Sequence, residues 1–145
     1  MKYGQLVLRA MVGGVLIYAG FMKAVGPSAE FAALISAYRI LPPSMITPFS
    51  IGLPYVEMWL GLFIFSGFYA RQAALAAMLL FTIFFIALVS TVLRGIDLVS
   101  CGCFGADSLT PRYTMILDFV LLSLSMIIYR QSKTPPSYSL DRVLP

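Results

Sequence analysis

Cys101 and Cys103 are the only cysteines of the chain, and a single glycine, Gly102, separates them. Their sulfur atoms can bond only if the backbone turns sharply, and Gly102 and Gly105 allow the positive φ angles that such a turn uses. Residues at this spacing lie near the upper limit of the Cα separation that a disulfide spans, so the bond is strained and readily reduced. The pattern favours a redox-active thiol pair, in a loop shaped by Gly102, Phe104 and Gly105.

Three other uses of the two cysteines are weaker. A structural disulfide across so short a ring removes little entropy from the unfolded chain, so it stabilises a fold poorly. A metal site needs further ligands, and the chain contains no histidine, which leaves Asp97, Asp107 or a partner protein to complete the coordination. Two unreacted cysteines in an apolar core do not suit a glycine-rich loop beside these carboxylates. We therefore expect thiol chemistry, with no metal and no cofactor.

The composition indicates an integral membrane protein. Hydrophobic residues make up 60% of the 145 residues and charged residues 11%, and the mean hydropathy is +0.91, values too apolar for a soluble domain. Four apolar runs are each close to the roughly 20 residues that cross a bilayer as a helix. We predict an all-α four-transmembrane-helix bundle in one domain, 1–131, followed by a polar cytoplasmic tail, 132–145. The predicted spans are about 6–22, 46–68, 72–93 and 113–130, with the cysteine loop at 95–111.

The residue types also exclude several function classes. Without histidine, the chain has no Ser-His or Cys-His nucleophile, no His-ligated haem and no imidazole proton shuttle. The formal net charge of +4 comes from basic residues near the span ends, which membrane orientation requires. We therefore expect the lipid bilayer as a partner and no nucleic acid.

The first apolar run has the basic start and apolar core of a signal peptide, but we interpret it as the first membrane helix. Arg9 is expected to extend to the lipid headgroups. Gly13, Gly14 and Gly20 are expected to allow another helix to approach closely.

A short helix is predicted between the first two spans. Phe31, Leu34, Ile35 and Tyr38 recur at helical spacing and form an apolar stripe, which is typical of a helix that lies in the membrane interface. The alternative is a lid over the cysteine loop.

Two carboxyl groups fall inside predicted spans. Glu57 lies near the middle of the second span, where a carboxyl group is costly and faces the bundle interior. Proton handling and structural pairing are equally good interpretations of Glu57, with Lys23, Tyr18 and Tyr55 as candidate partners. Asp118 lies little more than a helical turn below the cysteine loop, where it can handle protons or pair with a basic residue. The candidate charge partners of the carboxyl groups and thiols are Lys23, Arg39, Arg94 and Arg112.

The basic residues predict the orientation of the bundle. One side carries most of them and is expected to be cytoplasmic, together with both termini: Lys2, Arg9, Arg71, Arg130, Lys133 and Arg142. The cysteine loop then faces outward from a bacterial cytoplasmic membrane, into a compartment where dithiols and disulfides exchange.

Several segments are similar to the MauE/DoxX family of redox-associated membrane proteins, and most closely to its methylamine-utilisation MauE branch. They are Tyr18 to Lys23, Tyr38 to Pro42, Pro54 to Glu57, Arg94-Gly95 and, as the most specific, Cys101 to Gly105. The similarity covers nearly the whole chain.

The resemblance implies a four-helix membrane bundle that supports disulfide formation or electron transfer alongside an extracytoplasmic thioredoxin-like protein such as MauD. In methylamine systems it implies maturation of the disulfide-rich small subunit of methylamine dehydrogenase. The chain departs from the family pattern at Leu117-Asp118-Phe119, where a basic residue with asparagine is expected.

Two functions of different classes are therefore open. In the first, Cys101 and Cys103 exchange disulfides with a thioredoxin-like partner or a cysteine-rich client, which makes the protein a candidate thiol-disulfide oxidoreductase. In the second, the bundle is a non-catalytic anchor or chaperone that docks such a partner. The strain of the short ring favours the first.

Overall fold

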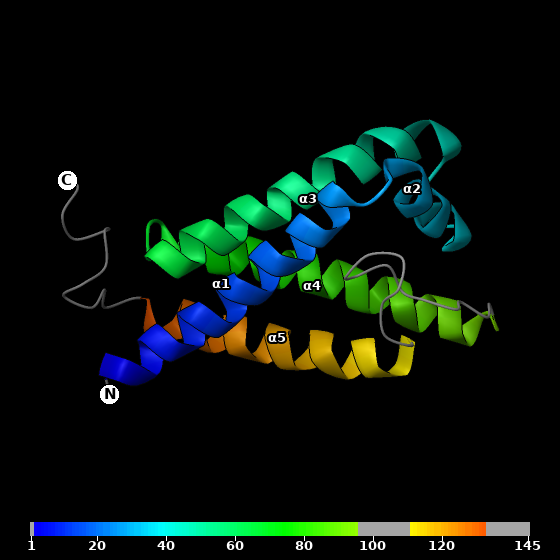
Figure 1. Cartoon of the computed structure of the whole chain (residues 1–145). Helices are drawn as coiled ribbons and strands as arrows, with labels where there is room; N and C mark the ends of the chain where they lie inside the picture. Colours follow the sequence, from blue (N-terminus) through cyan, green and yellow to red (C-terminus); the bar gives the residue numbers. More distant parts are fainter. Residues whose placement is uncertain (1, 96–110, 133–145) are drawn as a thin grey trace.

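The computed structural model describes residues 2–95 and 111–132, which form five α-helices and no strand (Figure 1). This confirms the all-α prediction, including a short helix between the first and second long ones. The helices are α1 (Lys2–Val25), α2 (Ser28–Ala37), α3 (Pro43–Ser66), α4 (Ala70–Leu93) and α5 (Pro111–Gln131). Residues 96–110, which include Cys101, Gly102, Cys103, Phe104 and Gly105, lie outside the described residues.

Four of the helices are long and apolar enough to cross a membrane. The candidate spans contain 22, 24, 24 and 19 residues, close to the roughly 20 that a bilayer requires. They are Gly4–Val25, Pro43–Ser66, Ala70–Leu93 and Tyr113–Gln131. The chain therefore has the architecture of a multi-pass membrane protein, as predicted.

The ends of α3 follow from two residue types. Pro43 stands at the start of the helix, where its missing N–H and fixed φ angle are tolerated. Gly67 ends the helix in the left-handed conformation, with φ 75°, and its N–H donates to the carbonyl of Phe63 at 3.0 Å. The short turn that follows makes α3 and α4 antiparallel neighbours.

The closest helix contact joins α1 to α3, and glycines make it. A Cβ atom added at Gly13 would lie 2.7 Å from the carbonyl oxygen of Gly61, and one added at Gly20 would lie 2.6 Å from that of Pro54. The two backbones therefore touch, as small residues permit in membrane helices. At Gly14 no atom of the described residues lies within 4 Å of the same position, so the expected close approach is confirmed for Gly13 and Gly20 but is wrong for Gly14.

The other extensive contact joins α4 to α5, so the bundle consists of the pairs α1–α3 and α4–α5 (Figure 1). Apolar side chains and small alanines of α4 fill the space between the pairs. The main buried members are Val12, Leu16, Ile64, Ala73, Ala74, Ala77, Phe81, Leu121 and Ile128.

The helix α2 lies at one end of the bundle, where α1 and α4 end and α3 and α5 begin (Figure 1). We call this the α2 end. Phe31 and Ile35 of α2 pack against Leu53 of α3 in a second, smaller core. Residues 96–110 connect α4 to α5 at the same end.

Arg9 corrects one expectation. Its relative exposure is 5%, so the residue is buried among the helices instead of extending to lipid headgroups. Arg9 shares the buried stripe of α1 with Val12, Leu16 and Lys23, at helical spacing.

Candidate functional site: a buried charge cluster

Lys23 and Glu57 form an ion pair in the interior of the bundle. The ammonium nitrogen of Lys23 donates to both carboxylate oxygens of Glu57, at 2.6 and 2.7 Å. Lys23 comes from the last turn of α1 and Glu57 from the central part of α3. Their relative exposures are 4% and 2%. The pair therefore compensates two charges that would be costly alone at this depth.

Two aromatic rings from other helices complete the surroundings of the ammonium group. The Lys23 nitrogen lies 5.6 Å from the ring centroid of Phe31 in α2 and 5.2 Å from that of Phe84 in α4. The faces of aromatic rings attract cations at such distances. Lys23 thus contacts side chains of α2, α3 and α4 at once and links them to α1.

Asp118 of α5 lies beside the pair. Its relative exposure is 5%, and it lines a cavity of about 20 Å³ together with Lys23, Glu57 and Phe84. This volume suffices for one water molecule, and charged groups on its wall supply the polar contacts that a buried water needs. Three ionisable residues from α1, α3 and α5 therefore face one small cavity.

The cluster unites several residues that the sequence singled out separately. Glu57, Asp118 and the candidate partner Lys23 belong to it. Tyr18 and Tyr55, the other candidate partners of Glu57, have exposed side chains. The contacts of Phe31 and Phe84 with Lys23 could not be predicted from the sequence, because they depend on how α2 and α4 pack at the α2 end.

The remaining candidate charge partners lie at the surface of the α2 end. Arg94 follows the last residue of α4, and its Nη1 atom donates to the backbone carbonyl of Arg39 at 3.5 Å. Arg39 and Arg94 are both exposed. The side chain of Arg112 is outside the part of the molecule that is described.

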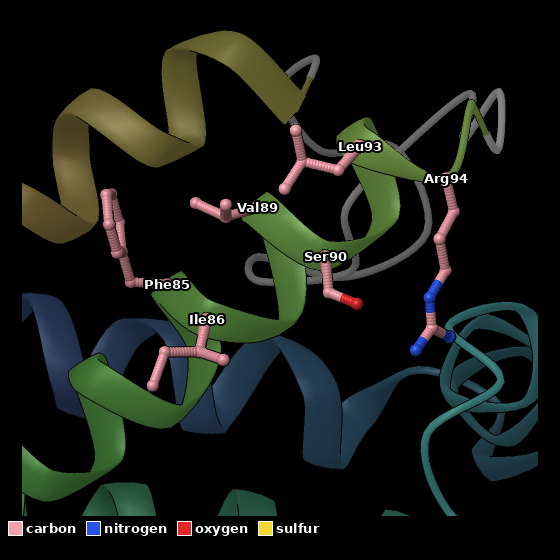
Figure 2. A pocket seen from close by; sticks show the side chains of 6 residues that line it. All are labelled: Phe85, Ile86, Val89, Ser90, Leu93 and Arg94. Atoms are coloured by element: carbon pink, nitrogen blue, oxygen red, sulfur yellow. The ribbon is translucent and has the colours of Figure 1, made fainter.

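A groove of about 440 Å³ runs along the exposed side of α4 up to Arg94. Figure 2 shows that its apolar side chains project from successive turns of α4, whereas Arg94 extends from the end of the helix in another direction. Its lining residues are Phe85, Ile86, Val89, Ser90, Leu93 and Arg94.

One protein-family model matches nearly the whole chain. The model of the family "Methylamine utilisation protein MauE" matches residues 1–130. The chain belongs to the MauE family. The resemblance to MauE that the sequence motifs indicated is thereby confirmed, and the four apolar helices are those of a multi-pass membrane protein of this family.

Two curated MauE proteins are similar to the chain. The methylamine utilization protein MauE of Paracoccus denitrificans is 31% identical over 101 residues, which are 68% of this chain and 54% of that protein. The MauE of Methylophilus methylotrophus is 31% identical over 74 residues, or 51% of this chain and 39% of that protein. The matched regions thus span about half or less of these relatives. No solved structure matches the chain.

Proposed function

We propose that this MauE-family protein is the membrane redox component of a methylamine-utilisation system and exchanges disulfides through Cys101 and Cys103. The observation that carries the proposal is the Cys-Gly-Cys sequence, which contains every thiol of the chain. The partner is a thioredoxin-like protein or a cysteine-rich client, such as the disulfide-rich small subunit of methylamine dehydrogenase.

Each round of exchange transfers two electrons between the partner and the protein and needs no third reactant. A thiolate of the partner attacks one sulfur of the Cys101–Cys103 disulfide, which forms a mixed disulfide and releases the other sulfur as a thiolate. The second thiolate of the partner then attacks the mixed disulfide. The partner leaves with a disulfide, and the protein retains two thiols and the two electrons. In the opposite direction the same steps reduce the partner.

The buried cluster supports this proposal through its position. Lys23 joins α1 to α2, α3 and α4 at the end of the bundle where residues 96–110 are attached. These contacts hold α4, from whose end the cysteine segment starts, against α1, α2 and α3. Arg94 and Arg112 flank the segment in sequence and can stabilise a thiolate, whereas Asp97, Asp107 and Asp118 oppose one.

Proton handling by Glu57 or Asp118 is a finer part of the proposal. Both oxygens of Glu57 contact Lys23, which favours charge compensation as its main role. Asp118 lines the same cavity as this pair, from α5, and it is the carboxyl group of the cluster that follows the cysteine segment in sequence, so it is the better candidate to exchange a proton with the thiols.

The proposed location is the cytoplasmic membrane of a bacterium, with both termini in the cytoplasm and the cysteine segment outside. The distribution of Lys and Arg supports this orientation, and an oxidising outer compartment suits disulfide exchange.

A second candidate is a non-catalytic anchor or chaperone that docks the same partner. The groove on α4 favours it, since its apolar wall and Arg94, at the end of that helix, offer a contact surface to a partner (Figure 2). In this function the cysteines only shape the docking loop.

Trapping of the mixed disulfide distinguishes the two functions. Cys101→Ser and Cys103→Ser each remove one sulfur, so whichever variant lacks the resolving thiol should accumulate an adduct with the partner. The adduct is measured on non-reducing gels of alkylated membranes, and it should disappear when a reductant is added.

Ser108→Ala, in the same segment, is the matched control and should give no adduct. The redox proposal is wrong if neither cysteine variant traps a partner and the double variant still supports disulfide formation in the client at the wild-type rate. That result favours the docking function.

A further inference from the structure

An apolar cavity of about 230 Å³ lies beneath α2, between this helix and the helices α3 and α4. It is distinct from the small cavity of the charge cluster. Its inner wall is formed by buried side chains, Phe31 and Ile35 of α2 and Leu53 of α3. Its outer wall includes the exposed side chains of Phe49 and Ile83, from faces of α3 and α4 that a bilayer covers. The cavity therefore leads from the lipid-facing surface into the protein.

The size and chemistry of this cavity fit a hydrocarbon chain. A cavity of about 150 Å³ with similar walls binds benzene, so the space here is large enough for an apolar ligand. Among the described residues, no charged side chain lines it, and Tyr38 is the only lining residue whose side chain carries a hydrogen-bonding group. A ligand with several carbonyl or hydroxyl groups would leave them without partners at these walls, which costs binding free energy. A saturated or isolated-alkene chain carries no such groups.

Two arginines lie close to residues that line the cavity, although neither lines it. Arg39 stands between Tyr38 and Ile40, which both line the cavity, and its left-handed backbone has φ 50°. Arg94, at the end of α4, reaches Arg39, since its Nη1 atom donates to the carbonyl of Arg39 at 3.5 Å. Both residues are exposed. Guanidinium groups are well suited to bind phosphate oxygens.

We propose that the protein binds one anionic phospholipid here, with an acyl chain in the cavity beneath α2 and the phosphate at Arg39 and Arg94. The lipid reaches the site from the bilayer, between Phe49 and Ile83. The inner end of its chain contacts Phe31 and Phe84, the two rings that hold Lys23. Bound lipid thereby packs against the charge cluster. This proposal is independent of the thiol chemistry.

Native mass spectrometry of the full chain in detergent tests the proposal. The protein is mixed with phosphatidylglycerol and phosphatidylcholine that carry identical chains, and the retained lipids are counted. The wild-type protein should retain one phosphatidylglycerol in preference to phosphatidylcholine. The double variant Arg39→Asn/Arg94→Gln should bind phosphatidylglycerol about 30-fold more weakly, because each basic residue near a lipid surface contributes about fivefold. Asparagine is chosen because it tolerates the left-handed conformation.

One further variant and two controls test the acyl-chain site and the headgroup site separately. Ala87→Phe places a ring in the cavity and should abolish lipid retention, whereas Ile86→Phe adds the same ring to the exposed side of α4 and should not. Arg71→Gln/Arg130→Gln removes the same charge at the opposite end of the bundle and should leave the single retained lipid in place.

A labelling experiment on the unchanged protein covers the case in which a variant fails to fold. Phosphatidylglycerol with a photoreactive group on its acyl chain should label the peptides that contain Phe49 and Ile83. The proposal is overturned if the label maps elsewhere, or if the two phospholipids are retained equally. It is also overturned if Ala87→Phe folds and still retains lipid. Finally, it is overturned if native mass spectrometry finds a lipid-soluble quinone bound in place of the phospholipid.

Discussion

At the scale of single residues, the Lys23–Glu57 pair determines how the α2 end is held together. Removing two charges from water costs several kcal/mol for each ion, and only good geometry and further contacts offset that cost. Here the ammonium group contacts both carboxylate oxygens and two aromatic rings. The charge of each partner is therefore tolerated only while the other is present.

We predict that removing one partner destabilises the protein more than removing both. Lys23→Met leaves the Glu57 carboxylate without compensation and should lower the free energy of unfolding by about 3–5 kcal/mol. The double variant Lys23→Met/Glu57→Gln should recover most of this loss, since no buried charge remains. Unfolding of the purified protein in mixed micelles, followed by circular dichroism, measures both variants and wild type.

Thiol turnover in the same variants separates structure from proton handling. If Glu57→Gln folds normally and turns over at the wild-type rate, Glu57 acts only as the partner of Lys23. Equal destabilisation in the single and double variants would contradict the charge-compensation argument.

The sequence was informative about which residues belong to the site but not about their contacts. A carboxyl group at mid-span indicated that Glu57 faces inward, and Lys23 was among its candidate partners. The choice between Lys23, Tyr18 and Tyr55 depends on the rotation of α1 about its axis. The face of α1 that turns inward is marked by a buried stripe: Arg9, Val12, Leu16 and Lys23. Because Arg9 was expected to lie at the lipid headgroups, this stripe was not recognisable as a buried face.

At the scale of helices, the glycine contact between α1 and α3 sets the distance at which Lys23 meets Glu57. The backbone of α1 touches α3 at two points along its length, Gly13 and Gly20. Because Lys23 lies less than one turn beyond Gly20, any displacement there moves the ammonium group relative to the carboxylate.

We predict that Gly20→Ala destabilises the fold by about 1–3 kcal/mol, the usual effect of overpacking. The new methyl group would lie 2.6 Å from the carbonyl oxygen of Pro54, so α1 and α3 must separate. Gly14→Ala is the matched control in the same helix, since its methyl group meets nothing within 4 Å. It should be neutral or stabilising by up to about 1 kcal/mol. The unfolding assay described for Lys23 measures both; a Gly20→Ala protein as stable as Gly14→Ala would rule out the close backbone contact.

Helix positions followed from the sequence more closely than helix ends or faces. The predicted span 46–68 differs from α3 at both ends, because Pro43 is compatible with the first helical position and Gly67 ends the helix in the left-handed conformation. Residue type alone predicts a close helix approach equally at Gly13, Gly14 and Gly20, because all three are small. Only the orientation of α1 toward α3 distinguishes them.

At the scale of the whole molecule, the membrane orientation determines which compartment the cysteine segment faces. We predict that Cys101 and Cys103 react with a membrane-impermeant maleimide in intact cells after mild reduction. In a variant without these cysteines, Gln72→Cys, at the start of α4 and on the opposite side of the bundle, should react only after the cells are lysed. The reverse pattern of labelling would mean that the termini are outside.

The class of the molecule was predictable because composition and run length are properties of the sequence alone. Four long apolar runs and one short amphipathic segment gave the helix order. The division into the pairs α1–α3 and α4–α5, and the two cavities at the α2 end, were not predictable. They arise from contacts between residues that are far apart in the sequence, such as Lys23 with Phe84.

Lys23 and Glu57 are 34 residues apart in the sequence, which has a consequence for the order in which they are synthesised. A ribosome produces α1 with its buried ammonium group well before the carboxylate that compensates it exists. Until α3 emerges, Lys23 must extend toward the membrane surface, which its position in the last turn of α1 allows. The buried position of Lys23 therefore becomes favourable only once α3 supplies Glu57, so the ion pair couples the final packing of α1 to the insertion of α3.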